Sequence, residues 1–125
     1  MSFVLRFISL SATGREIIRT REVGREIVTI GRDPGSDIHL TDLEVTQHHA
    51  TLRQLAPHRM ALEATAELPI RIEGRATKHQ EIDAARGSEI RIGSHRLLIG
   101  AGEEPGQIVI QVDRVERILA ADDEE

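Results

Sequence analysis

Short runs of aliphatic residues recur along the chain and alternate with turn signals rich in glycine, serine and proline. The first run predicts a strand over residues 2–10 and is apolar on both faces at Phe3, Val4 and Leu5. Turns then precede predicted strands over 16–20 and 25–30. A turn at intervals of about eight to ten residues is typical of a β-sandwich.

The second half of the chain continues this pattern. The predicted strands there cover residues 49–54, 59–65, 70–72, 88–92, 95–99 and 107–112. Residues 93–94 are a two-residue loop of the kind favoured in hairpins, so the strands on either side are the clearest predicted pair. After the last strand, Val115, Ile118 and Leu119 have helical spacing, which predicts a short helix over 113–121.

The composition fits one domain with an aliphatic core. A chain of 125 residues is long enough for one hydrophobic core. Apolar residues make up 39% of the chain but aromatic residues only 2%, namely Phe3 and Phe7, so Ile, Val and Leu must supply most of the core. We expect this domain to cover residues 1–121.

The negative charge is concentrated at the end of the sequence. The formal net charge is −5, and the acidic residues 122–125 supply four of these charges, which leaves −1 for the rest. We expect 122–125 to be an acidic tail or the start of a linker to the rest of a larger protein. The acidic balance and the lack of stacking aromatic residues argue against nucleic-acid binding.

The lack of cysteine, of a signal peptide and of a long apolar run bears on the expected cellular location of the protein. The sequence contains no cysteine, which excludes disulfides and thiol chemistry. We find no signal-peptide pattern, and no run approaches the roughly 18 apolar residues that cross a bilayer. We therefore expect a cytoplasmic protein without membrane insertion by this segment.

Residues 30–50 carry the most informative motif, which reads I-G-R-D-P-G-S-D-I-H-L-T-D-L-E-V-T-Q-H-H-A. A predicted strand ends at Gly31 and Arg32, and a polar turn over 33–37 follows. A short apolar run over 38–40 separates this loop from a second loop that supplies a hydroxyl, an amide and two imidazoles. If both loops lie at one edge of a sandwich, they bring together the parts of an oxyanion or phosphate site.

This motif resembles that of the forkhead-associated (FHA) domain, a β-sandwich family that binds phosphothreonine peptides through its loops. The family pattern is Gly-Arg, then Ser-x-x-His, then an Asn-Gly loop. Gly31 and Arg32 match the first part, and residues 46–49 match the second with threonine in place of serine. The resemblance covers residues 3–99. It implies an all-β, FHA-type sandwich of about ten to twelve strands with the short C-terminal helix.

The resemblance implies a role for each matching residue. Arg32 would bind phosphate oxygens with its planar guanidinium, and Thr46 would donate its hydroxyl to the phosphate. Gln47 would contact the backbone of the peptide. Gly31 and His49 would support the site, the histidine by bracing the loop through a hydrogen bond rather than by touching the ligand.

The residues alone leave structural roles open for two of these side chains. Arg32 is also placed to form a surface ion pair with Asp33 or Asp37, a kind of contact that contributes roughly 0–1 kcal/mol. Thr46 is also suited to stabilise its own loop through the hydroxyl.

The third part of the family pattern is not matched. Counting back from Gly74, the loop that should read Ser-Thr-Asn-Gly falls on residues 66–69. Leu68 then replaces the asparagine that holds the peptide main chain, and Glu67 replaces a threonine. A carboxylate at this position would repel a phosphate by about 1–4 kcal/mol at contact.

Catalysis, cofactors and metal ions have no support in the sequence. His48 and His49 are neighbours and point to opposite faces of a strand, and the other histidines lack ligand spacing, so we expect no metal site. Residues 100–102 begin like a dinucleotide loop but lead into a strand instead of a helix. We therefore expect a protein that is not an enzyme and has no cofactor.

Two functions remain. The first is a signalling module that binds a phosphorylated protein or peptide at phosphothreonine through Arg32, Thr46 and Gln47. The alternative is a divergent FHA domain that mediates phosphate-independent protein–protein interaction or scaffolding. The intact Gly31-Arg32 pair favours the first function, and the loop over 67–69 favours the second.

Overall fold

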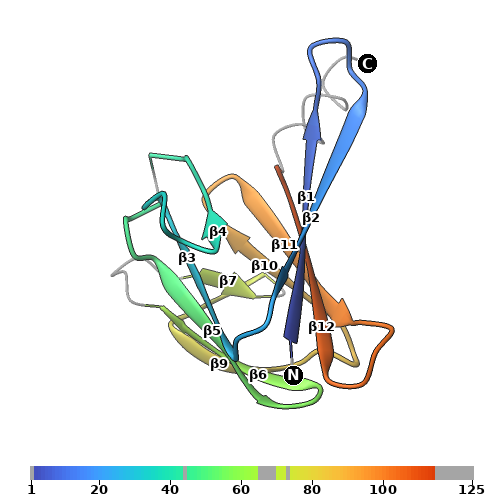
Figure 1. Cartoon of the computed structure of the whole chain (residues 1–125). Helices are drawn as coiled ribbons and strands as arrows, with labels where there is room; N and C mark the ends of the chain where they lie inside the picture. The colour runs from blue at the N-terminus through green and yellow to red at the C-terminus, as the bar shows by residue number, and fades with distance from the viewer. Residues whose placement is uncertain (1, 44, 65–69, 73, 115–125) are drawn as a thin grey trace.

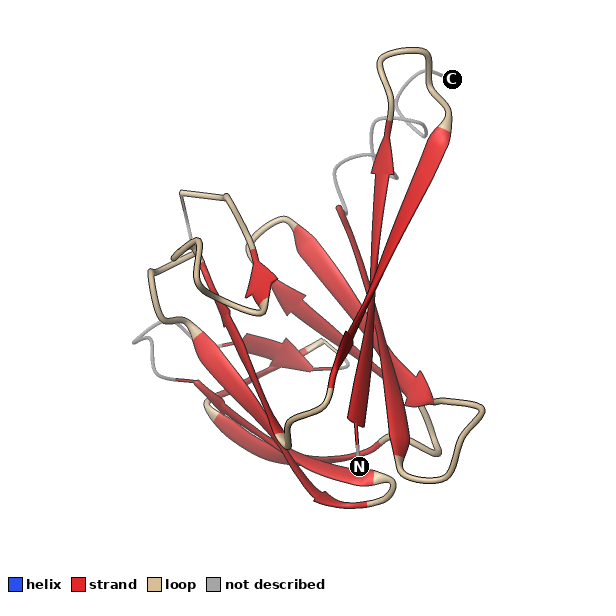
Figure 2. Ribbon diagram, viewed as in Figure 1, coloured by secondary structure: helices blue, strands red, loops and turns tan. Residues whose placement is uncertain are grey.

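Two β-sheets pack face to face in the computed structural model, which describes residues 2–43, 45–64, 70–72 and 74–114 (Figure 1). The described residues contain strands β1–β12 joined by loops and turns (Figure 2). The larger sheet has the strand order β2-β1-β12-β11-β10-β7-β8 and the smaller one the order β4-β3-β5-β6-β9. The prediction of an all-β sandwich is confirmed.

The larger sheet is mixed, because β1 pairs in parallel with β12 and antiparallel with β2. Its strands are β1 (Ser2–Leu10), β2 (Glu16–Val23), β7 (Ile70–Ile72), β8 (Arg75–Thr77), β10 (Ser88–Ile92), β11 (His95–Ala101) and β12 (Gln107–Arg114). The strands of the smaller sheet are β3 (Ile27–Gly31), β4 (Ile38–His39), β5 (Ala50–Ala56), β6 (Arg59–Ala64) and β9 (His79–Asp83).

The core between the sheets is aliphatic, as the composition predicts. Alternate residues of β3, β5 and β6 point inward, among them the fully buried Val28, Leu52 and Leu62. Phe3 and Leu5 of β1 meet them from the larger sheet with no exposed surface. This period of two on the facing sides of both sheets is the pattern of a sandwich.

Two strands and several strand boundaries differ from the prediction, and the largest consequence is at the end of β12. β8 and β9 were not predicted, because their residues are mostly exposed and polar and lack apolar alternation. Asp113 and Arg114 extend β12 instead of starting a helix. Asp113 lies opposite Arg96 in the neighbouring strand and accepts two hydrogen bonds from its guanidinium, at 3.1 and 2.7 Å. The rest of the predicted helix, over 115–121, lies outside the described residues, as does the predicted tail over 122–125.

No helix long and apolar enough to cross a membrane is found in the described part of the chain.

Candidate functional site

The loop after β3 and the loop before β5 lie side by side at one end of the sandwich. The Arg32 amide donates to the Thr46 carbonyl at 2.9 Å, and the Asp33 amide donates to the Gln47 carbonyl at 3.2 Å. These two bonds continue the pairing of β3 with β5 beyond the strand ends. The loops that carry the predicted phosphate-binding residues are therefore directly bonded to each other.

Gly31 allows this close approach of the two loops. A Cβ at position 31 would lie 2.1 Å from the Gln47 carbonyl oxygen and 3.2 Å from the Ser36 hydroxyl oxygen. A contact of 2.1 Å with backbone cannot be relieved by rotating a side chain. Only glycine fits here, which is the physical reason for a glycine directly before the arginine.

Arg32 is held by a backbone contact and not by an ion pair with a described residue. Its Nε donates to the Val45 carbonyl at 3.0 Å, and its side chain is half-buried. The carboxylate of Asp33 instead accepts from the Gly35 amide at 3.1 Å and lies 3.9 Å from the His48 ring. Among the described residues, no carboxylate forms an ion pair with Arg32, so the two Nη groups of a positioned guanidinium are available to an anion.

Asp37, the other suggested partner of Arg32, anchors the loop to β3. Its buried carboxylate pairs with Arg25 and accepts from the amide and hydroxyl of Thr29 at 3.0 and 3.2 Å. The Asp37 amide in turn donates to the Thr29 hydroxyl at 3.0 Å. Contacts with Arg25 and with the Thr29 amide and hydroxyl therefore hold Asp37 and attach the end of this loop to β3.

The second loop is braced from within by His49. The Thr46 amide donates to His49 Nδ1 at 3.1 Å, and the Thr46 hydroxyl oxygen lies 3.4 Å from the same nitrogen. His49 is buried, whereas the side chains of Thr46 and Gln47 are exposed to solvent. His49 thus has the contacts of the bracing residue that the sequence predicts, and Thr46 and Gln47 stand at the surface beside Arg32.

Burial lowers the pKa of His49 below its ordinary value of 6.5. The neutral ring is also the form that can accept a hydrogen bond at Nδ1 from the Thr46 amide. The hydrogen bond from the Thr46 amide therefore requires an unprotonated His49, and protonation would remove the acceptor.

Sequence reasoning missed two further residues that position these loops. The exposed His39 contacts the Arg32 carbonyl oxygen through Nε2 at 3.0 Å. Asp42 Oδ2 accepts from the Ser94 amide at 2.9 Å, from the Ser94 hydroxyl, and from His95 Nδ1 at 3.0 Å. Asp42 therefore ties the second loop to the turn between β10 and β11, a contact between residues more than fifty positions apart for which the sequence carries no signal.

The pKa of Asp42 reflects this cluster. Burial opposes ionisation, but the hydrogen bonds from Ser94 and the charge of His95 outweigh it and lower the pKa of Asp42 below its ordinary value of 3.8. The carboxylate is thus the stable form in the folded protein. Gly93 leaves room for it, because a Cβ there would lie 2.9 Å from Asp42 Oδ2.

The loop over 66–69, with Glu67 and Leu68 at the expected peptide-holding positions, lies outside the described residues.

Comparison with known proteins identifies the family. A model described as the FHA domain matches residues 28–93, more than half of the chain and including both loops. The protein belongs to the FHA domain family. FHA domains are generally interaction modules rather than enzymes. No curated protein sequence matches the chain.

Solved structures share the fold at low sequence identity. EmbR from Mycobacterium tuberculosis, in complex with a low-affinity phosphopeptide, has a TM-score of 0.57 and 19% identity over 76% of this chain and 28% of that chain. The FHA domain of CT664 from Chlamydia trachomatis has a TM-score of 0.57 and 19% identity over 78% of this chain and 94% of that one. A chain from a study of phosphothreonine-dependent FHA domain interactions has a TM-score of 0.56 and 16% identity, with 89% and 96% covered.

Proposed function

We propose that the domain binds phosphothreonine peptides at the end of the sandwich where the two loops meet. Arg32 contacts the phosphate through its Nη groups, Thr46 donates its hydroxyl to a phosphate oxygen, and Gln47 bonds to the peptide backbone. Gly31 and His49 act indirectly, through the loop conformation. A signalling role in the cytoplasm, within a larger protein, stays a prediction from the sequence.

The observation that carries this proposal is that the Arg32 side chain is held in place without an ion pair to a described carboxylate. Its Nε is fixed on the Val45 carbonyl, and the neighbouring carboxylates of Asp33 and Asp37 have other partners. A guanidinium that is already oriented loses little side-chain entropy when it binds an oxyanion, which favours affinity. Thr46 is next to it, because its carbonyl accepts from the Arg32 amide.

Two of the similar structures concern phosphorylated ligands of their own proteins. One similar structure contains a low-affinity phosphopeptide, and another comes from work on phosphothreonine-dependent interactions. These descriptions concern those proteins, and at under 25% identity they support the fold of this chain. The ligand itself must be tested on this chain.

The test is a titration of the full chain with a degenerate phosphothreonine peptide library, followed by calorimetry with the selected peptide. We expect binding that requires the phosphate and that falls about tenfold to a hundredfold in Arg32→Ala, the range expected for hydrogen bonds to a charged group. Arg53→Ala is the matched control, because Arg53 is an exposed arginine in the middle of β5.

The alternative is phosphate-independent interaction or scaffolding, and the sequence over 67–69 favours it. Leu68 offers no side-chain hydrogen bond to a peptide, and Glu67 would repel a phosphate. A partner that binds wild type and Arg32→Ala equally, with or without phosphate, would establish this function instead.

A further inference from the structure

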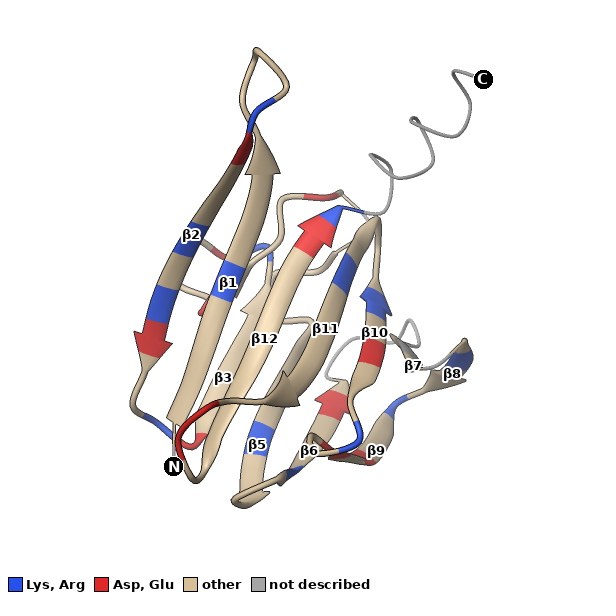
Figure 3. Ribbon diagram, turned by 90° about the vertical axis from the view of Figure 1, so that its right-hand side faces the viewer, with Lys and Arg blue, Asp and Glu red and all other residues tan. Residues whose placement is uncertain are grey.

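Among the described strands, β2 is the longest of the four that lie at the edge of a sheet. The outermost strands of the two sheets are β2, β8, β4 and β9. β4 has two residues and β8 three, and short edge strands of this kind are a common protection against unwanted pairing. β2 has eight residues, and its hairpin with β1 rises above the rest of the molecule in both views (Figures 1 and 3).

The raised part of this hairpin exposes apolar side chains. Residues 16–22 are all exposed, although neighbouring residues of a strand point to opposite faces. Ile18 is 56% exposed, Leu10 49% and Ile17 41%. Leu10 and Ile18 lie on one face of the hairpin and Ile17 on the other, so both faces of β2 expose an aliphatic side chain as well as charged ones.

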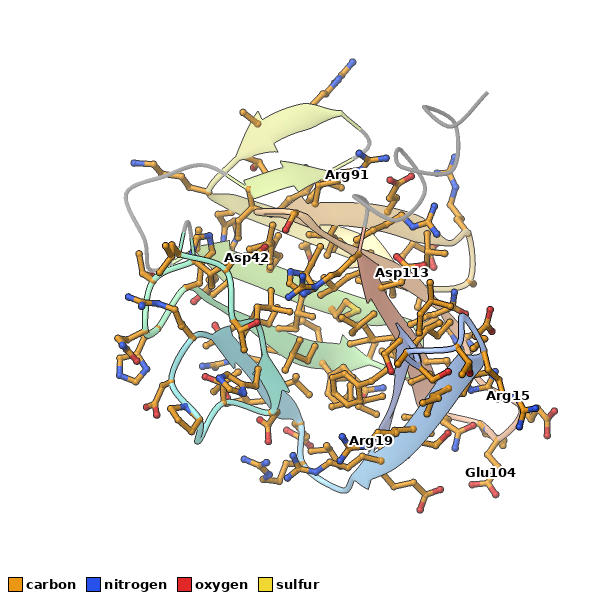
Figure 4. All side chains as sticks on the ribbon, turned by 90° about the horizontal axis from the view of Figure 1, so that it is seen from above. Arg15, Arg19, Asp42, Arg91, Glu104 and Asp113 are labelled. Atoms are coloured by element: carbon orange, nitrogen blue, oxygen red, sulfur yellow. The ribbon has the colours of Figure 1, made fainter. Side chains whose placement is uncertain are left out.

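Each face of β2 has its own chemistry. Ile17, Arg19 and Arg21 lie on the face that also carries Phe7 and Leu5 of β1, because these residues are directly opposite each other. Arg21 lies 3.9 Å from Asp37, while Arg19 extends from the outer margin of the hairpin (Figure 4). This face thus has an aliphatic residue followed by two arginines at alternate positions.

The other face of β2 carries Glu16, Ile18, Thr20 and Glu22. Its two ends are acidic and its middle is aliphatic and hydroxylic. A strand that fits the edge must therefore complement both faces: carboxylates opposite the arginines, β-branched residues opposite the isoleucines, and cations opposite the glutamates.

A second copy of the chain does not meet this requirement. Along a strand, the N–H and C=O groups of successive residues point alternately to one side of the strand and to the other. In an antiparallel pair, a residue whose groups point toward the partner strand lies opposite a residue whose groups point back at it. Two copies of β2 can therefore pair only with odd positions opposite odd positions and even positions opposite even ones. Aligning residues 16–22 places Arg19 opposite Arg19 and Glu16 opposite Glu22, and aligning 17–23 places Arg19 opposite Arg21. Aligning 15–21 places Arg15 opposite Arg21, and aligning 14–20 places Arg15 opposite Arg19. Like charges directly opposite each other are destabilising.

We propose that the β2 edge binds an extended segment of a partner protein by strand addition. The segment carries carboxylates at two alternate positions, followed by β-branched residues, and runs antiparallel to β2. Its main chain pairs with the outward N–H and C=O groups of β2, beside which the described residues place no further strand, and its side chains supply the specificity. This surface is separate from the loop site and does not depend on phosphate binding.

The probe is the peptide acetyl-Lys-Glu-Thr-Glu-Val-Val-Lys-amide, whose two glutamates face Arg21 and Arg19 when it pairs antiparallel with β2. Hydrogen exchange of the full chain, followed residue by residue by NMR, should show new protection at alternate amides of β2. A control peptide with lysine in place of both glutamates should bind at least about fivefold more weakly. Protection elsewhere, or none, would refute strand addition.

Two variants distinguish strand pairing with β2 from nonspecific electrostatic attraction between the probe and the protein. Arg19→Glu should weaken the probe about fivefold or more and bind the lysine control peptide instead. Arg15→Glu, an equal charge change outside β2, should change the affinity less than twofold. Equal losses in both variants would overturn the proposal. Arg32→Ala should bind the probe as wild type does, which distinguishes this surface from the phosphate site.

Two other possible occupants of the β2 edge, a second copy of the chain and the acidic residues 122–125, would give different results. Sedimentation of the wild-type chain should show a monomer, and a dimer broken by Arg19→Glu would identify a second copy as the occupant. Replacing acidic residues 122–125 with their amides should leave the affinity for the probe unchanged. A large gain in affinity would identify the acidic tail as the occupant and contradict the proposal.

Discussion

The Gly-Arg pair at positions 31 and 32 can be recognised in the sequence as a motif. The physical reason why position 31 must be glycine can be seen only in the structure. The pair was identified from the motif, whereas the cause is the contact with the Gln47 backbone on a loop reached through β4. Arg32 was predicted to bind phosphate or to pair with Asp33 or Asp37. The choice between these roles depends on the partners of the two carboxylates, which only the structure shows.

Gly31→Ala should lower the free energy of unfolding by about 1–3 kcal/mol, because the added methyl group forces the two loops apart. Chemical denaturation measures this change. Gly24→Ala is the control, since a Cβ at position 24 has no atom within 4 Å. If Gly31→Ala has the same free energy of unfolding as the wild type, the backbone of Gln47 does not approach Gly31 as closely as the structure shows.

His49 should make stability depend on pH. Its pKa is lowered in the folded protein, so the unfolded chain binds more protons at mildly acidic pH. The contribution is fully present above pH 6.5 and is lost as the pH falls through 6.5 toward the lowered value. Denaturation curves over about pH 5 to 8 should show this slope in wild type and a flatter one in His49→Gln. Identical slopes would show that His49 does not brace the loop in its neutral form.

At the scale of the elements, the strands that sequence reasoning found are those with apolar alternation. β1, β7 and β10 have the predicted bounds, and each has buried aliphatic residues. β8 and β9 were missed because both are exposed strands whose place is set by pairing with β7 and β6. Pairing with a neighbour is a tertiary effect, and a local pattern does not contain it.

The contact of Asp42 with the turn between β10 and β11 should stabilise the second loop against the larger sheet. Asp42→Asn keeps the shape but weakens the bonds from Ser94 and His95, and should cost about 1–3 kcal/mol. Thermal unfolding near neutral pH measures the loss. Asp83→Asn is the control, because that carboxylate accepts only the nearby Ala85 amide among the described contacts.

The Asp42 carboxylate should also make the stability of the protein depend on pH. Because the pKa of Asp42 is lowered in the folded state, its contribution is present above 3.8 and is lost as the pH falls below that value. The difference in stability between wild type and Asp42→Asn should therefore shrink in acid. A difference that does not change with pH would show that the Asp42 charge is not involved.

For the whole molecule, the fold followed from the sequence more completely than the site. Alternating aliphatic runs and the Gly-Arg motif were enough to predict an FHA-type sandwich. The site depends on contacts between loops, such as Arg32 Nε on the Val45 carbonyl and Asp42 on Ser94, and on the loop over 66–69, which lies outside the described residues. The binding roles of Arg32, Thr46 and Gln47 stay predictions.

The most direct test of the central claim is an NMR titration of the full chain with one phosphothreonine peptide and its unphosphorylated form. The signals of Arg32 Nε and of the Thr46 and Gln47 amides should shift with the phosphorylated peptide alone, and the shifts should be absent in Arg32→Ala. Equal shifts with both peptides, or shifts confined to residues away from the two loops, would contradict a phosphate site between Arg32 and Thr46.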